Sequence, residues 1–426
     1  MPLLLLSYFA FLGISLPDGL LGVSWPSMSV SFGQPVGALG LMLPFAVVTS
    51  MLSSASTGAL LSRIGLGRIL SGSVGLYALA LFTQSLTSSF WVFIVAAVTL
   101  AAGSGAIDAA LNAFAARHFD ARRITWLHAV YGLGAAAGPL VFIGTAMAGL
   151  SWRWAFASVA ALLTVLTVVF ACTSRLWPTI QQPRSPSSHA EKQPKRRMRL
   201  PVAVWSGAAM FALQTGVETG TALWAYSFLT TARAVPPDAA AATTSGYWIA
   251  LLLSRVIMGP VATRTGPRPI LRACLVGMCV GATMLILPGL APVGGVVLLG
   301  FSAAPMYPLL TLTTADRVGT AWTDRTIGLQ SAASAAGSAT LPALIGLLIG
   351  PYGSQVIAPS LLVLAGLNAA VFAWITSTTP RRGPRSGPEA SPGGRGRQRG
   401  GDLADPEAGP DVRHSGVAEA EDRGEP

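Results

Sequence analysis

The sequence predicts an all-α integral membrane protein with twelve transmembrane helices, arranged as two pseudo-repeated six-helix bundles. Three observations lead to this fold class. The composition is too apolar for a water-soluble chain, apolar stretches of membrane-spanning length follow one another, and one loop motif recurs in both halves. Together they imply a protein whose outer surface contacts a lipid bilayer.

The composition excludes several classes of protein. Of 426 residues, 52% are hydrophobic and 11% are charged, with a mean hydropathy of +0.58, whereas soluble domains carry about 25% charged residues. A soluble enzyme, a disordered regulator and a coiled coil are therefore not expected. The net charge of +11 does not indicate nucleic-acid binding, because basic residues cluster between apolar stretches and nine of the 17 acids lie in the last 40 residues.

Twelve stretches reach the roughly 20 mostly apolar residues that a membrane-spanning helix requires. In the first half they are Leu3–Trp25, Val36–Ser62, Ile69–Leu86, Phe90–Ala116, Ile124–Leu150 and Trp154–Leu176. In the second half they are Pro201–Phe228, Thr243–Ala262, Ile270–Leu290, Val293–Thr313, Thr326–Ile349 and Val356–Ser377.

The remaining segments divide the chain into four parts. Residues 1–176 and 201–379 are the two predicted bundles, and the basic, Pro- and Ser-rich stretch 177–200 is a cytoplasmic linker between them. Residues 380–426 are rich in Gly, Pro and Arg and then in acids, so we expect a disordered cytoplasmic tail. No basic residue precedes the first span, which favours a translation start upstream of Met1.

The distribution of basic residues determines the predicted orientation. Loops on one side of the membrane contain seventeen Lys and Arg residues, whereas loops on the other side contain only Arg153 and Arg233. Because cytoplasmic loops carry the excess of basic residues, we expect the linker and both termini to lie in the cytoplasm. The protein is expected to be a multi-pass monomer in the inner cell membrane.

A loop motif occurs twice at a spacing of 201 residues, each time after the second span of its half. The first copy contains Gly58, Arg63 and Gly65, followed by Arg68, and the second contains Gly259, Arg264 and Gly266. Parallel six-span repeats are a transporter architecture, with the substrate site near the membrane midplane between the halves. We expect Arg63 and Arg264 to close the cytoplasmic side by bonding carbonyls at helix C-termini.

The first copy resembles the signature loop between the second and third spans of the major facilitator superfamily, although Ser62 stands where that family usually has Asp. Three further stretches resemble the fucose–proton-symporter-like branch, a group of sugar permeases. They are Leu16–Gly22, Gly103–Asn112 and Trp126–Gly132. The resemblance covers about residues 3–378, and it implies transport by alternating access between two bundles.

A competing motif lies in the fifth span. Gly134, Gly138 and Pro139 form a Gly-xxx-Gly-Pro element that resembles one in proton-coupled drug antiporters. The paired glycines that should follow are absent, because Val141 and Phe142 stand near that place. We favour the alternative that these small residues allow close helix packing and that Pro139 bends the span.

Three acids lie within spans: Asp18, Asp108 and Glu218. A charge at the membrane midplane costs at least ~2.5–3.5 kcal/mol, so such residues face a cavity or a partner. We expect them to take part in proton coupling, with His128 relaying protons between water and Asp108; a neutral, hydrogen-bonded structural carboxyl is the alternative. Arg255, the one base within a span, is expected to snorkel or to cap a helix end, which leaves the acids without a basic partner.

Polar and aromatic side chains near these acids are candidates for contacting the solute. Asn112 and Gln214 each lie four residues from an acid and therefore on the same helix face. The predicted substrate-binding residues are Asn112, Tyr131, Gln214, Trp224 and Gln330. For Trp224, anchoring at the membrane interface is the alternative.

The sequence predicts no cofactor, no metal site and no catalytic constellation; Cys172, Cys274 and Cys279 lie in apolar stretches without metal-ligand spacing. We therefore expect a non-enzymatic, secondary-active transporter whose partners are protons and a small-molecule substrate. The leading interpretation is uptake of a neutral, hydroxyl-rich solute such as a sugar, because unbalanced acids disfavour an anion. The alternatives are proton-coupled efflux of amphipathic or cationic small molecules, and a non-transporting membrane sensor or enzyme.

Overall fold

The computed structural model describes residues 2–177, 202–319 and 322–378. Most of the predicted linker and the whole predicted tail lie outside these ranges. The described residues form helices and short connections, without strands. Eleven helical segments are long and apolar enough to cross a membrane, one of them the broken segment Ala291–Leu312, and the 26-residue helix Val202–Ser227 is a twelfth of comparable length.

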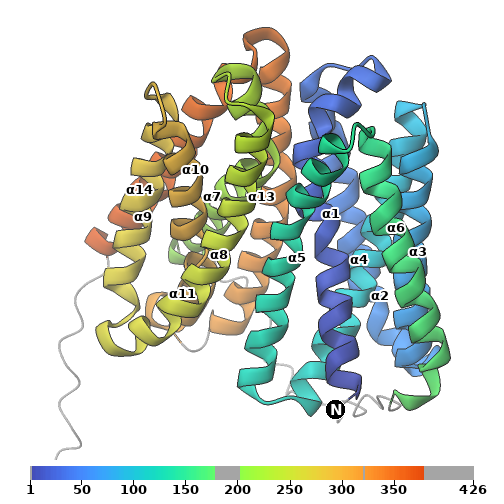
Figure 1. Cartoon of the computed structure of the whole chain (residues 1–426). Coiled ribbons are helices and arrows are strands. Elements are labelled where there is room, and N and C mark those ends of the chain that lie inside the picture. Colours follow the sequence, from blue (N-terminus) through green and yellow to red (C-terminus); the bar gives the residue numbers. More distant parts are fainter. Residues whose placement is uncertain (1, 178–201, 320–321, 379–426) are drawn as a thin grey trace, which may run out of the picture. The chain divides into compact units, whose positions relative to one another are not determined.

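The elements follow the predicted spans in number and order (Figure 1). The first half contains α1 (Pro2–Phe32), η1 (Val36–Leu41), α2 (Met42–Ile64), α3 (Leu66–Leu86), α4 (Phe90–His118), α5 (Ala121–Met147), α6 (Trp152–Cys172) and η2 (Ser174–Leu176). The second half contains α7 (Val202–Ser227), η3 (Phe228–Ala232), α8 (Pro237–Thr265), α9 (Pro267–Ile286), α10 (Ala291–Ala303), α11 (Met306–Leu312), α12 (Thr314–Val318), α13 (Thr323–Tyr352), η5 (Ser354–Val356) and α14 (Ile357–Thr378).

The boundaries depart from the prediction in three places. The first helix continues seven residues past Trp25, whose indole Nε1 donates to the Val36 carbonyl at 2.5 Å and so holds the following turn against it. The predicted span Val293–Thr313 is interrupted near Pro305, where α10 ends and α11 begins, because proline offers no backbone N–H. Trp177, assigned to the polar linker, is 6% exposed and packs its ring against Phe114 and Phe170.

The same pairs of helices pack together in both halves. The third helix lies against the sixth in each case, as α3 against α6 and α9 against α14 (Figure 1). Gly65 and Gly266, the second glycines of the repeated motif, have φ angles of 82° and 83°, a conformation that suits glycine. The structure thus confirms the repeat. Residues Met1–Thr379 form one compact unit, so the division into separate domains stays a prediction.

Arg153 and Arg233, predicted to lie on the outer side, have matching roles in the two halves. Arg153 Nη1 donates to the carbonyls of Ser85 at 2.9 Å and Thr87 at 2.6 Å, at the end of α3. Arg233 Nη2 donates to the carbonyls of Leu285 at 2.6 Å and Ile286 at 2.9 Å, at the end of α9. Each guanidinium therefore caps the negative end of a helix dipole within its own half.

The element in α5 that resembles drug antiporters serves close packing against α1. A β-carbon on Gly134 would lie 2.3 Å from the Leu12 carbonyl oxygen, and one on Gly138 would lie 2.6 Å from the Leu20 nitrogen. Both distances are shorter than a β-carbon permits, so only glycine allows this approach. These contacts support the interpretation that the motif allows close helix packing.

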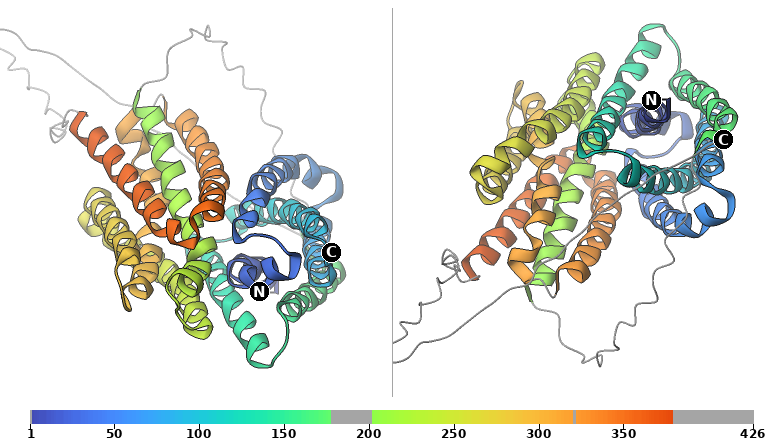
Figure 2. Two further views of the ribbon diagram at one scale, coloured as in Figure 1. Left: turned by 90° about the horizontal axis from the view of Figure 1, so that it is seen from above. Right: turned by 90° about the horizontal axis from the view of Figure 1, so that it is seen from below.

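The two halves meet closely at the end of the helices that carries η1. A β-carbon on Gly40 would lie 3.0 Å from Ala343 Cα, and one on Gly22 would lie 2.9 Å from the Ala222 carbonyl oxygen. Within the second half, the Trp224 indole donates a hydrogen bond of 3.0 Å to the Pro342 carbonyl and so joins α7 to α13. Both views in Figure 2 show the helices of the two halves running alongside each other.

Candidate functional site

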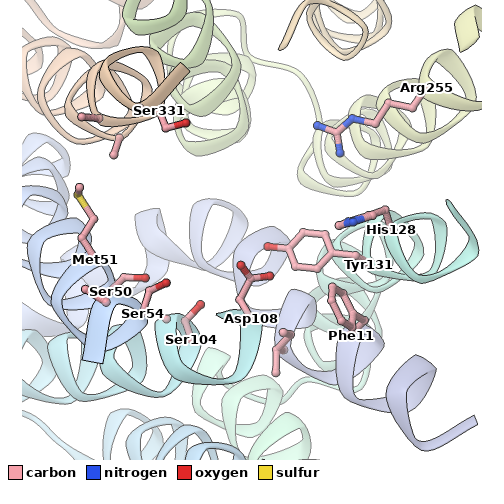
Figure 3. A pocket seen from close by; sticks show the side chains of 16 residues that line it. Phe11, Ser50, Met51, Ser54, Ser104, Asp108, His128, Tyr131, Arg255 and Ser331 are labelled. Atoms are coloured by element: carbon pink, nitrogen blue, oxygen red, sulfur yellow. The ribbon is translucent and has the colours of Figure 1, made fainter. Parts of the chain in front are cut away.

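A cavity of about 800 Å³ opens between the two halves (Figure 3). Residues of α1, α2, α4 and α5 line it from the first half, and residues of α8 and α13 line it from the second. The polar side chains in its wall are Ser50, Ser54, Ser104, Asp108, His128, Tyr131, Arg255 and Ser331. Eight of the 16 lining residues carry polar side chains, which suits the cavity to water or a polar solute.

The cavity lies toward the end of the helices that carries the repeated loops. Of its lining residues, Arg255 lies in the C-terminal half of α8, whose C-cap is the loop residue Gly266. Gly328 lies five residues after the start of α13. The opposite end is closed by the packing of η1 against α13. In the predicted orientation, the cavity is therefore on the cytoplasmic side of a closed outer end.

Asp108 is exposed in the cavity wall and accepts a hydrogen bond of 2.9 Å from Asn112 Nδ2, one turn further along α4. Both residues thus lie on one face of the helix, as predicted. Gly105 allows this face to reach α2, because a β-carbon there would lie 2.1 Å from the Ser50 carbonyl oxygen. Asn112, which was predicted to bind the solute, thus donates a hydrogen bond to Asp108, which was predicted to carry the proton.

Asp18 lies on the face of α1 that carries the cavity residues Phe11 and Ile14, and its side chain is exposed. Its carboxylate accepts a hydrogen bond from the Tyr131 hydroxyl of α5. One turn earlier on α5, the His128 ring packs edge-on against Phe11 with a centroid distance of 5.8 Å. Figure 3 shows Asp108, Tyr131 and His128 together on the wall of the first half.

Glu218 has a basic partner, which corrects the prediction from the sequence. Arg255 Nη2 lies 3.3 Å from Glu218 Oε1, and the pair joins α8 to α7. Arg255 does not snorkel, because its guanidinium lines the cavity between the halves. The expectation that the three acids lack a base was therefore wrong, and the argument it supplied against anionic solutes falls with it.

Three predicted solute ligands are buried and do not line the cavity in this conformation. Gln214 is 0% exposed and donates to Glu218 at 2.7 Å and to the Ala303 carbonyl at 3.2 Å. Trp224 is 0% exposed in the packing of α7 against α13. Gln330 is 1% exposed and accepts a hydrogen bond of 3.0 Å from Thr314, so its side chain points into the second half.

The basic residues of the repeated loops are exposed in this conformation. Among the described residues, neither Arg63 nor Arg264 has a hydrogen-bond or ion-pair partner. The predicted closure of the cytoplasmic side would require the two halves to approach each other there. The role of these arginines therefore stays a prediction for a second conformation.

The described part of the chain contains no group of three His, Cys, Asp or Glu side chains that could hold a metal ion. Its cysteines, Cys172, Cys274 and Cys279, are free. The chemistry of the cavity thus rests on its carboxyl, imidazole, phenol, hydroxyl and guanidinium groups.

A polar cavity between two repeated six-helix halves, closed at one end, is the architecture of a membrane transporter. The family comparison agrees with this class. The model of the Major Facilitator Superfamily matches residues 4–234 and 218–415, and the chain belongs to this family.

Solved structures of other transporters share the fold. The nucleoside transporter NupG superposes with a TM-score of 0.68 at 14% sequence identity, over 88% of this chain and 99% of that one. A bacterial homologue of the human lysosomal transporter Spinster, inward-facing and unoccupied, gives 0.67 at 14% over 88% and 95%. The peptide transporter POT in complex with sulfate gives 0.64 at 16% over 87% and 94%. No curated protein sequence matches the chain.

Proposed function

We propose that this protein is a proton-coupled secondary transporter that takes up a neutral, hydroxyl-rich solute such as a sugar across the inner cell membrane. The observation that carries the proposal is the exposed Asp108 carboxyl in a cavity whose remaining polar wall consists largely of hydroxyl groups. Membership of the transporter family supports the class of the proposal, and the hydroxyl groups of the cavity wall support the solute.

Asp108 is the proposed site of proton binding. An ionised carboxyl within the membrane is costly unless it faces water or a partner, and Asp108 has the cavity in front of it and only the neutral Asn112 beside it. His128 lines the same cavity from α5 and is also exposed. An imidazole in this place can pass protons between the cytoplasmic water and Asp108.

The serine side chains are the proposed contacts for the solute hydroxyls. Ser50, Ser54 and Ser104 lie in the wall of the first half, and Ser331 lies in the wall of the second. A hydroxyl group both donates and accepts a hydrogen bond, so such a wall can match several hydroxyls of one sugar. A solute held by serines from both halves would couple its binding to their relative movement.

Efflux of amphipathic cations is the weaker alternative. Gly134 and Gly138, which resemble the antiporter element, are accounted for by the close packing of α1 and α5. A non-transporting sensor or enzyme has no observation in its favour beyond the cavity itself.

The test is transport by purified protein in proteoliposomes. With an inwardly directed proton gradient, we expect accumulation of at least one member of a panel of radiolabelled aldoses and polyols, abolished by a protonophore. Extrusion of cationic dyes in the same vesicles, without sugar accumulation, would favour the antiporter. Sugar accumulation that persists without a proton gradient would contradict proton coupling.

A further inference from the structure

Arg255 is a cavity residue with unused hydrogen-bonding capacity. Its side chain is 39% exposed, and the single hydrogen bond that it makes to a described residue runs from Nη2 to Glu218 Oε1 at 3.3 Å. A guanidinium has five N–H donors in a rigid planar fork. Most of these donors are therefore available to a molecule in the cavity.

The packing of α5 against α8 places Arg255 in the wall of the solute cavity. A β-carbon on Gly132 would lie 3.2 Å from Leu252 Cβ, so the two helices approach closely at this point. Arg255 lies one turn beyond Leu252, and His128 lies one turn before Gly132. Figure 3 shows the guanidinium facing the side of the cavity that carries His128 and Tyr131.

Glu218 is held in place on both its side chain and its backbone. Gln214 donates to the carboxylate at 2.7 Å and is itself fixed to the Ala303 carbonyl at 3.2 Å. The Tyr247 hydroxyl donates to the Glu218 carbonyl at 2.7 Å. The carboxylate is thus preorganised before Arg255 binds to it, and it restricts where the guanidinium can point.

We propose that Arg255 is a specificity-determining residue that donates two hydrogen bonds to adjacent oxygens of the solute, a vicinal diol, while Glu218 acts as its positioning residue. This inference rests on the proposed function and specifies the part of the solute that Arg255 recognises, a vicinal diol. The ion pair has no net charge and the cavity wall carries the Asp108 carboxyl, so the site favours a neutral diol over a carboxylate. A planar fork matches two oxygens held side by side, as it matches a carboxylate.

The test is solute exchange across proteoliposomes at equal pH on both sides, which requires no proton coupling. The probes are the aldoses that the wild-type protein exchanges, their single-position deoxy analogues and the corresponding aldonic acids. Arg255→Lys keeps the charge and removes the fork, and Arg272→Lys, on an exposed position of α9, is the matched control. Size-exclusion profiles verify that each variant is folded.

We expect Arg255→Lys to raise the half-saturation concentration about tenfold, which corresponds to one lost good hydrogen bond, with a nearly unchanged maximal rate. Wild-type protein should discriminate against the deoxy analogue that lacks one diol hydroxyl, and Arg255→Lys should not. Glu218→Gln should raise the half-saturation concentration as well, and Glu218→Asp should restore part of the loss, because a carboxylate can still orient the guanidinium.

Unchanged discrimination in Arg255→Lys would overturn this inference while leaving the proposed function intact. Preference of wild-type protein for aldonic acids, together with tighter acid binding in Glu218→Gln, would overturn the inference and also the neutral solute of the proposed function, while leaving proton-coupled transport in place. The second result would assign Arg255 to an anionic solute. Failure of wild-type protein to exchange any aldose or polyol would instead contradict the proposed function, and the inference would fall with it.

Discussion

Gly37 and Gly346 bring the two halves of the transporter into backbone contact at the end opposite the cavity. A β-carbon on Gly37 would lie 2.0 Å from the Gly346 carbonyl oxygen, and one on Gly346 would lie 2.8 Å from the Gly37 carbonyl oxygen. Neither position has room for a side chain. The closure of this end, which is the outer end in the predicted orientation, therefore depends on the absence of two side chains.

Gly37→Leu should prevent closure of that end, because the new side chain would occupy the space of the α13 backbone. Overpacking of this kind costs about 1–3 kcal/mol, enough to shift the population toward an outward-open state. The measurement is labelling of Ala222→Cys by an impermeant maleimide added outside cells. Gly350→Leu, one turn further on α13 with open space around it, is the control and should leave labelling low. Equal labelling in both variants would contradict the role of the glycine contact.

Asp108→Asn should abolish proton-driven accumulation and spare solute exchange. Asparagine has nearly the size of aspartate and keeps one acceptor oxygen, but its amide group does not titrate near neutral pH, and exchange requires no net proton movement. Accumulation and exchange are measured side by side in proteoliposomes, with Asn112→Asp as a variant that retains Asp108. Accumulation against a gradient by Asp108→Asn would remove Asp108 as the coupling carboxyl.

Arg63→Ala and Arg264→Ala should slow the transport cycle more than they weaken solute binding. In the present conformation both side chains are exposed, and bonds to helix C-terminal carbonyls would form only when the cytoplasmic side closes. The loss of one such bond corresponds to about a threefold slower cycle. Turnover and half-saturation concentration are determined for each variant. A large rise in half-saturation at constant turnover would place these arginines in binding instead.

A cysteine at Ser187 should react with labelling reagents only from the cytoplasm. Seventeen basic loop residues on one side against two on the other predict that the linker is cytoplasmic. Labelling is compared between intact cells and inside-out vesicles with an impermeant maleimide. Modification in intact cells would reverse the predicted orientation, and the cavity would then open to the outside.

Much of the fold could be predicted from the sequence because hydropathy and backbone chemistry are local properties. Each predicted span corresponds to a helix or a broken pair of helices, and the glycines at 65 and 266 adopt the same left-handed φ in both loops. The break before α11 was missed because Pro305 sits within an apolar stretch that reads as continuous. Hydropathy detects burial in lipid and is insensitive to where a helix is interrupted.

The site was predicted less completely, because partners depend on how each helix is rotated about its axis. Asp108 and His128 do line one cavity, but the pairing of Glu218 with Arg255 joins residues 37 positions apart on different helices. One signal was available: Arg255 lies deeper within a predicted span than any other Lys or Arg, and such a base is the natural partner of an intramembrane acid. Gln330 shows the reverse error. It lies 202 residues after His128, close to the 201-residue spacing of the repeat, which suggested that both face the cavity, but its side chain packs within the second half.

The hydrogen bonds from Arg153 and Arg233 to helix ends have a consequence for how the chain folds during synthesis. Arg153 donates hydrogen bonds to the end of α3, and Arg233 donates hydrogen bonds to the end of α9. Each arginine clamp, as we call such a set of bonds, therefore joins elements of its own half. The first can therefore form during synthesis, before any residue beyond α6 has left the ribosome. A folding defect caused by losing either clamp would be confined to one half of the chain, which makes each six-helix repeat a candidate unit of biogenesis as well as of movement.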